Sequence, residues 1–148
     1  MNLFIYIEIG GTGGGAFRPM YADFLEESSH ICRVPELSRA ASDFRVCGEQ
    51  WSGIARAAMP DEWDCLGRSR RLMVKKNELF EREGPKATDK IVRINQEIDV
   101  ELMRTIREEF DSLGSQRAAD LMEDLNRRIL DLERSEAEAF NSLREAIG

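Results

Sequence analysis

A run of six small residues near the start of the chain, Gly10-Gly11-Thr12-Gly13-Gly14-Gly15, is its most distinctive chemical feature. The backbone N–H groups of such a loop and of the helix that follows it attract anions, because they are free donors at the positive end of the helix dipole. Arg18 falls in the first turn of that helix, where a cation is disfavoured. It therefore predicts a negative partner, either a bound anion or a buried carboxylate such as Glu8.

This loop predicts a ligand-binding site made of Gly11, Thr12, Gly13, Gly14, Gly15, Arg18 and Tyr21. Tyr21 either lends its hydroxyl to the site or packs in the core, since it lies on an apolar helical stripe. The alternative is structural, because glycines allow a sharp turn with positive φ and a close approach to neighbouring elements. Residues 11–16 also fit the spacing G-x-G-x-x-A, but neither a second strand nor a Gly-Lys-Ser/Thr sequence follows. A nucleotide is therefore not the expected ligand.

The cysteines and the histidine predict neither a zinc site nor a catalytic pair. Cys32, Cys47 and Cys65 are widely spaced, and His30 is the only histidine. Structural zinc needs about four such ligands at short spacings. His30 and Cys32 are two residues apart, so on a helix they do not face each other. We expect buried cysteines, no catalytic residue, no metal, no cofactor and a reduced, cytoplasmic setting.

A second feature is a cluster of positive charge. Residues 68–76 contain five cations and no acid: Arg68, Arg70, Arg71, Lys75 and Lys76. Such a run is either a solvated helix face or a docking site for an acidic partner. These five residues are the candidates for partner docking.

Hydrophobic spacing predicts one strand followed by several helices. Residues 3–9 follow a period-two pattern rich in β-branched and aromatic side chains, which predicts an N-terminal β-strand. Such a strand must pair with another strand, because the backbone N–H and C=O groups along its edge need hydrogen-bond partners. Glycines 67, 84 and 114 are expected to end helices. Apolar residues at steps of three and four predict helices over residues 16–30, 35–58, 69–83, 88–113 and 116–146, with a short helical start at 60.

The predicted fold is therefore mainly α: a helical bundle of about five helices with one N-terminal β-strand and a glycine-rich strand-to-helix loop. The length of 148 residues suits one domain, 1–148. Residues 1–58 hold the glycine motif and the first two helices, and residues 59–148 form a charged helical part with a long C-terminal hairpin. The net charge of −7 argues against nucleic acid as a partner. We also expect no membrane partner, since no apolar run is long enough to span a membrane, and no signal peptide, since the apolar run over residues 3–7 has neither a basic start nor a small-residue cleavage site.

The last predicted helix carries a heptad seam that a charge interrupts. One interpretation is antiparallel packing on the preceding helix, and the other is a coiled coil between two copies of the chain. The seam residues are Met122, Leu125, Ile129, Leu132, Glu136, Ala139, Leu143 and Ala146.

Parts of the first 58 residues resemble a known family. Residues 9–18, residues 20–27 and the later Trp51-Ser52-Gly53-Ile54-Ala55 are similar to an uncharacterised domain in the C-terminal part of butirosin biosynthesis protein H-like proteins. The resemblance implies a preceding domain like a cysteine peptidase. It also implies an acyltransferase activity that moves an aminoacyl group from an acyl carrier protein thioester to an aminoglycoside amine. The nucleophilic cysteine would belong to the preceding domain, which we expect to be absent here, so no residue of this chain inherits that role.

Three functional hypotheses remain open, and they leave open whether the chain is an enzyme. The first is an accessory or substrate/carrier-docking domain of an acyltransferase-like family, with a cysteine-peptidase-like domain or an acyl carrier protein as its partner. The second is a helical dimerisation or adaptor module without catalysis, a homodimer formed through residues 115–147. The third is a small-molecule or phosphate-binding enzyme that works through the glycine loop.

Overall fold

The computed structural model describes residues 1–10 and 13–148, which fall into two compact units. We call residues 2–57 with 123–148 the glycine-loop unit, and residue 1 with 58–122 the basic-run unit. Every regular element of the described chain is helical, so the mainly α prediction is confirmed. The prediction of one domain over residues 1–148 stays a prediction.

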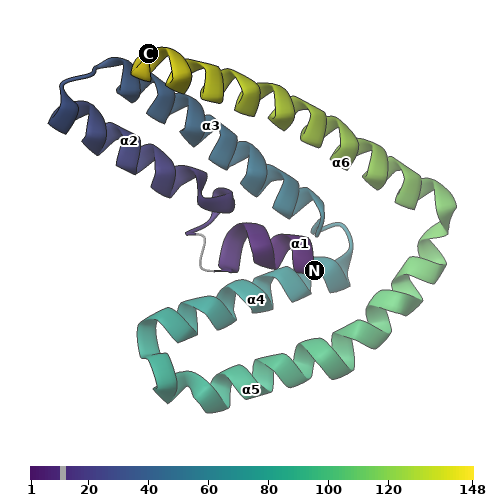
Figure 1. Cartoon of the computed structure of the whole chain (residues 1–148). Helices are drawn as coiled ribbons and strands as arrows, with labels where there is room; N and C mark the ends of the chain where they lie inside the picture. Colours follow the sequence, from purple (N-terminus) through teal and green to yellow (C-terminus); the bar gives the residue numbers. More distant parts are fainter. Residues whose placement is uncertain (11–12) are drawn as a thin grey trace. The chain divides into compact units, whose positions relative to one another are not determined.

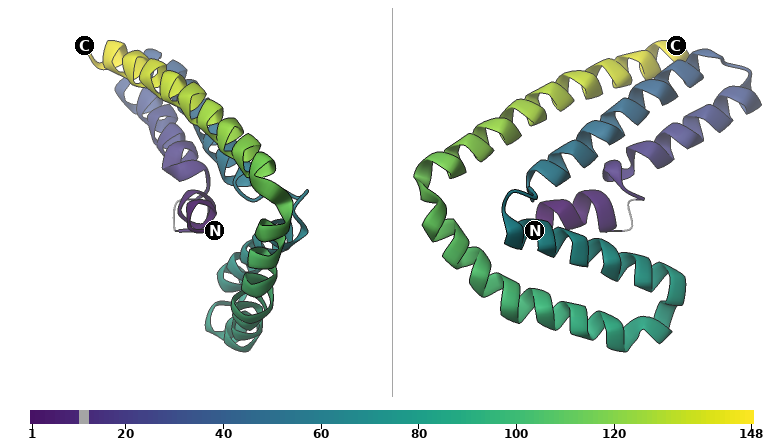
Figure 2. Two further views of the ribbon diagram at one scale, coloured as in Figure 1. Left: turned by 90° about the vertical axis from the view of Figure 1, so that its right-hand side faces the viewer. Right: turned by 180° about the vertical axis from the view of Figure 1, so that it is seen from behind.

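In the glycine-loop unit, three helical segments lie alongside one another (Figure 1). Helices α2 (Arg18–Cys32) and α3 (Glu36–Ala57) form an antiparallel pair, and the C-terminal part of α6 (Met103–Ile147) runs antiparallel to α3. The two further views in Figure 2 show the same arrangement. The core of this unit includes the α3 side chains of Phe44, Cys47 and Ile54, which are at most 1% exposed.

The predicted N-terminal β-strand is wrong, because residues 2–9 form α1 (Asn2–Phe4) and the π-helix η1 (Ile5–Ile9). Phe4 and Ile7 are each 3% exposed, whereas Tyr6 is 73% exposed. Residues three apart share one face of a helix, so this burial follows helical spacing. A strand would also lack a partner, since the described residues contain no other strand, whereas a helix satisfies its backbone internally. The segment is almost wholly apolar, and its periodicity therefore could not separate the two structures.

The glycine-rich segment consequently joins two helices and not a strand to a helix. The short 3-10 helix η2 (Gly15–Phe17) leads from it directly into α2. Helix α3 begins at Glu36 and ends at Ala57, which confirms the helix predicted over residues 35–58.

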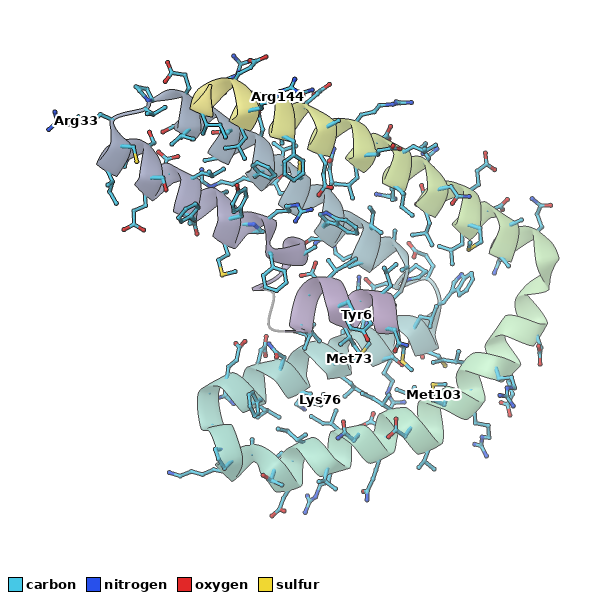
Figure 3. All side chains as sticks on the ribbon, in the orientation of Figure 1. Tyr6, Arg33, Met73, Lys76, Met103 and Arg144 are labelled. Atoms are coloured by element: carbon cyan, nitrogen blue, oxygen red, sulfur yellow. The ribbon has the colours of Figure 1, made fainter. Side chains whose placement is uncertain are left out.

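In the basic-run unit, α4 (Asp64–Glu83) is followed by η3 (Gly84–Ala87), α5 (Thr88–Gln96), the π-helix η4 (Glu97–Leu102) and the first part of α6. Met73 of α4 is 2% exposed, and Ile94 and Ile98 of the returning segment are 7% and 6% exposed. Figure 3 shows Lys76 between α4 and α5, where its Nζ donates to Asn95 Oδ1 at 3.2 Å.

Two of the predicted helix ends are wrong, and each has a physical reason. Helix α4 continues through Gly67, where an added Cβ would lie 2.8 Å from Asp61 Oδ1, so this glycine permits close packing on the preceding loop. Helix α6 continues through residue 114 as one helix over Met103–Ile147. One glycine inside a helix costs only about 1 kcal/mol, which flanking helix-forming residues offset. Gly84, with φ +55°, does end α4 as predicted.

Candidate functional site

The glycine loop adopts a run of left-handed backbone angles before α2 begins. Gly13, Gly14 and Gly15 have φ values of +66°, +81° and +54°, which confirms the predicted turn with positive φ. Ala16 and Phe17 continue it at +51° and +67°, although a side chain makes this region unfavourable. The two remaining predicted loop residues, Gly11 and Thr12, lie outside the described residues.

Close backbone packing against α3 holds this turn in place. A Cβ added to Gly15 would lie 2.8 Å from the carbonyl oxygen of Gly48, and one added to Gly48 would lie 2.9 Å from Pro19 Cδ. A real Cβ atom does not approach other atoms this closely. The close contact between the turn and α3 therefore requires glycine at both positions. The turn and the first residues of α2 are therefore seated directly on the backbone of α3.

Arg18 has a carboxylate partner, but it is not Glu8. Its Nε donates to Glu136 Oε1 at 2.7 Å, and its Nη2 lies 2.6 Å from the same oxygen. Trp51 Nε1 also donates to Glu136 Oε1, at 2.9 Å. The side chains of Arg18 and Glu136 are only 26% and 21% exposed. Of the two predicted kinds of partner, the structure supplies the internal carboxylate, and the residue that interrupts the heptad seam is the one that provides it.

An apolar hollow of about 380 Å³ lies beside this ion pair. Tyr21 and Phe44 meet edge to face with ring centroids 4.9 Å apart, and Phe44 meets Phe140 in the same way at 5.1 Å. Tyr21 also stacks on Phe24 at 6.0 Å. The residues that line the hollow, which we call the aromatic hollow, are Phe17, Arg18, Met20, Tyr21, Phe24, Phe44 and Phe140.

A second depression, of about 560 Å³, lies at the glycine loop itself. We call it the glycine cleft; its lining includes Gly13, Gly14 and Gly15 together with charged residues of η1 and α3. It shares no lining residue with the aromatic hollow. The structure therefore divides the predicted ligand site, because the described loop glycines line the cleft whereas Arg18 and Tyr21 line the hollow.

The thiols differ in exposure. Cys32 is exposed, whereas Cys47 and Cys65 are buried, so the expectation of burial holds for two of the three. His30 lies 3.8 Å from Glu26 and is 78% exposed in its side chain. Burial, with a smaller contribution from the negative charge of Glu136, raises the pKa of the Cys47 thiol from 9.0 to about 11. Near neutral pH this thiol is protonated, which makes it a poor nucleophile.

The raised pKa of Cys47 predicts a loss of stability at alkaline pH. The unfolded chain releases this proton near pH 9.0 and the folded chain only near pH 11. The contribution of the protonated thiol to the free energy of unfolding is therefore complete below pH 9.0 and is lost as the pH rises toward 11. Denaturant titrations of the wild type and of Cys47→Ala across this range check it. We expect the free energy of unfolding to fall more steeply with pH in the wild type; parallel curves would contradict the assignment.

The basic run makes ion pairs and hydrogen bonds within its own unit. Arg70 and Arg71 both donate to Asp61, at 2.5 and 2.8 Å. Arg68 donates to Glu97 of η4 at 2.5 Å. Lys76 donates to Asn95 of α5. The remaining lysine of the run is exposed. These contacts offset part of the positive charge, and the docking role of the run stays a prediction.

Several contributors to these sites were not predicted, and two of them come from the far end of the chain. Phe140 and Glu136 lie on the C-terminal part of α6, more than 90 residues after α3 begins. A charge at position 136 within an otherwise apolar seam was the available signal for a buried partner. Phe140 had no comparable signal, because it lies outside the seam positions.

Within residues 1–10 and 13–148, no group of three or more His, Cys, Asp or Glu side chains is arranged to hold a metal ion. In the same residues, no helix combines the length and apolar character needed to cross a membrane.

Comparison with known families shows the following match. A family model described as a domain of unknown function (DUF4872) matches residues 2–92. Those residues include the glycine loop, α2, α3 and α4. Neither the curated proteins nor the solved structures yielded a match.

Proposed function

The chain belongs to the family described as a domain of unknown function (DUF4872), and we propose that it is a docking domain that holds an acyl substrate or its carrier. In finer terms, it would serve an acyltransferase-like protein similar to butirosin biosynthesis protein H. The observation that carries the proposal is the aromatic hollow, where apolar side chains are exposed around one depression.

The exposed apolar side chains of the hollow come from α2, from α6 and from the short helix η2. On α2, Met20 is 57% and Phe24 59% exposed, and on α6 Phe140 is 51% exposed. Phe17, the last residue of η2, is 45% exposed. Single exposed apolar residues are ordinary, but a contiguous group around a depression is typical of a binding surface. Burying this group against a ligand would therefore stabilise the complex.

The chemistry of the hollow favours an uncharged, apolar group. Its single charged lining residue is Arg18, whose guanidinium is already paired with Glu136. A free anion would have to compete with that carboxylate for the same donors. An acyl chain makes no such demand, because it needs only apolar surface. Arg18 is therefore assigned to the wall of the site as a positioning residue and not as an anion ligand.

The homodimer hypothesis has less support from the packing. Two positions of the seam, Leu132 and Ala139, are 4% and 0% exposed within the chain itself, and Glu136 is engaged by Arg18. These positions are therefore not free to form a seam with a second copy. An acyl carrier protein or a cysteine-peptidase-like domain is the partner we propose, in a cytoplasmic setting.

A calorimetric titration with octanoyl-phosphopantetheine, compared with unacylated phosphopantetheine, tests the proposal. We expect the acylated molecule to bind more tightly, because only it offers an apolar chain to the hollow. The substitution Phe24→Ser should weaken its binding by about tenfold, the effect of removing one aromatic contact from the site. Phe24 is 59% exposed, so the substitution should leave the fold intact.

Ile31→Ser is the matched control, since Ile31 lies on the same helix, is 73% exposed and does not line the hollow. It should bind the acylated probe as the wild type does. Equal binding of the two probes, or an unchanged affinity in Phe24→Ser, would refute the docking proposal. Sedimentation of the same variants tests the homodimer alternative. If the wild type is a dimer and Phe24→Ser is a monomer, the hollow binds a second copy of the chain and not an acyl group.

A further inference from the structure

We propose that the glycine cleft is a second binding site, for a small molecule that carries both an amino group and an acidic group. The cleft is lined by Glu8, Gly13, Gly14, Gly15, Pro19, Arg45, Gly48, Glu49, Ser52 and Arg56. Because it shares no residue with the aromatic hollow, this inference does not depend on the proposed docking function.

The first supporting observation is the carboxylate of Glu8. Its Oε1 atom is buried and has no hydrogen-bond partner among the described residues. Its other oxygen lies against the glycine loop, 3.2 Å from where a Cβ of Gly14 would be. A buried acceptor that lacks a donor is costly, and because the Glu8 side chain lines the cleft, an ammonium group bound there would pair with its carboxylate. Glycine at position 14 therefore leaves room for the carboxylate beside the loop.

The second observation is that charges of both signs in the cleft lack partners within the described chain. Arg56 on the last turn of α3 makes no ion pair with a described residue, and neither does Glu49 two turns earlier. Arg45, in contrast, is paired with Asp23 at 3.1 Å. Arg56 is thus the guanidinium of the cleft that remains available for an anion.

These charges together specify the class of ligand. An ammonium group would pair with Glu8, and a carboxylate or phosphate of the same molecule would pair with Arg56. A molecule with only one of these groups would leave the opposite charge unmatched.

The test compares 4-aminobutyrate with butylamine and butyrate, titrated into the full chain at one ionic strength and followed by calorimetry. The two simpler molecules each keep one of the charged groups. We expect 4-aminobutyrate to bind about tenfold or more tightly than either of them, since each charge-assisted hydrogen bond is worth at least that factor. Equal binding of all three, or binding of none, would overturn the proposal.

Four variants locate the site. Glu8→Gln and Arg56→Gln should each reduce the affinity for 4-aminobutyrate to that of the single-charge molecules. Glu27→Gln on α2 and Arg39→Gln on α3 are controls, because both residues are exposed and neither lines the cleft. Controls that weaken binding as much as the cleft variants would refute the assignment.

A thermal melt separates binding from a structural role of Glu8. If its carboxylate serves a ligand, Glu8→Gln should not lower the melting temperature of the free protein, because the unpartnered oxygen stabilises nothing there. A melting temperature well below that of the wild type would instead show that Glu8 supports the fold, and the proposal would fall.

Discussion

Replacing Gly15 with alanine is expected to lower the free energy of unfolding by about 3 kcal/mol, from left-handed backbone strain plus steric overlap. Gly15 has φ +54°, and its added Cβ would lie 2.8 Å from the carbonyl oxygen of Gly48 and 3.0 Å from its Cα. Both are backbone atoms of α3 and cannot rotate away as a side chain would. The turn must therefore move off α3, and the start of α2 must move with it.

Gly13→Ala isolates the part of this effect that comes from backbone angles. Gly13 has a similar φ of +66°, but its added Cβ would meet no atom of the described residues within 4 Å. We expect a loss of only about 1 kcal/mol there, the cost of a left-handed alanine. Denaturant titration of both variants gives the comparison. Equal losses at the two positions would show that the contact between Gly15 and Gly48 does not hold the turn.

Replacing Glu136 with alanine should destabilise the chain by about 2 kcal/mol, because one acceptor serves two donors in a half-buried position. Arg18 and Trp51 both donate to Glu136 Oε1, at 2.7 and 2.9 Å. Without it, a guanidinium that is 26% exposed loses its counter-charge. Arg18→Ala combined with Glu136→Ala should cost less than the sum of the single changes, since both remove the same interaction.

Asp124→Ala is the matched control on the same helix. Asp124 also accepts from two arginines, Arg127 and Arg128, but their side chains are 70% and 46% exposed. Exposed pairs contribute little, so we expect a change below about 1 kcal/mol. Chemical denaturation measures both variants, and equal losses for Asp124→Ala and Glu136→Ala would contradict the importance assigned to Glu136.

Local sequence predicted the helices well where polar and apolar residues were clearly separated. Helix α3 and the end of α4 at Gly84 matched, since periodicity and the stop signal agreed. The segment over residues 2–9 did not, because its mostly apolar residues fit a strand and a buried helix equally. Whether this segment becomes a strand or a helix depends on whether another strand is present to pair with it. The presence of such a strand is a property of the whole fold.

The candidate sites could be predicted only in part, for a related reason. Arg18 correctly pointed to a negative partner, but Glu136 is 118 residues away along the chain, and local spacing cannot identify it. Likewise, Phe140 completes the aromatic hollow from α6, whereas Tyr21 and Phe24 come from α2. The loop predicted one ligand site, and tertiary packing placed its described residues in two separate depressions.

Mapping the bound acyl probe by NMR tests the central claim most directly, because it shows where binding occurs as well as whether it occurs. With octanoyl-phosphopantetheine added to the full chain, we predict that shift changes concentrate at Met20, Tyr21, Phe24 and Phe140, which line the aromatic hollow. The same changes should be absent with unacylated phosphopantetheine. Shifts confined to the basic run at residues 68–76, or no shifts at all, would contradict a docking function for this hollow.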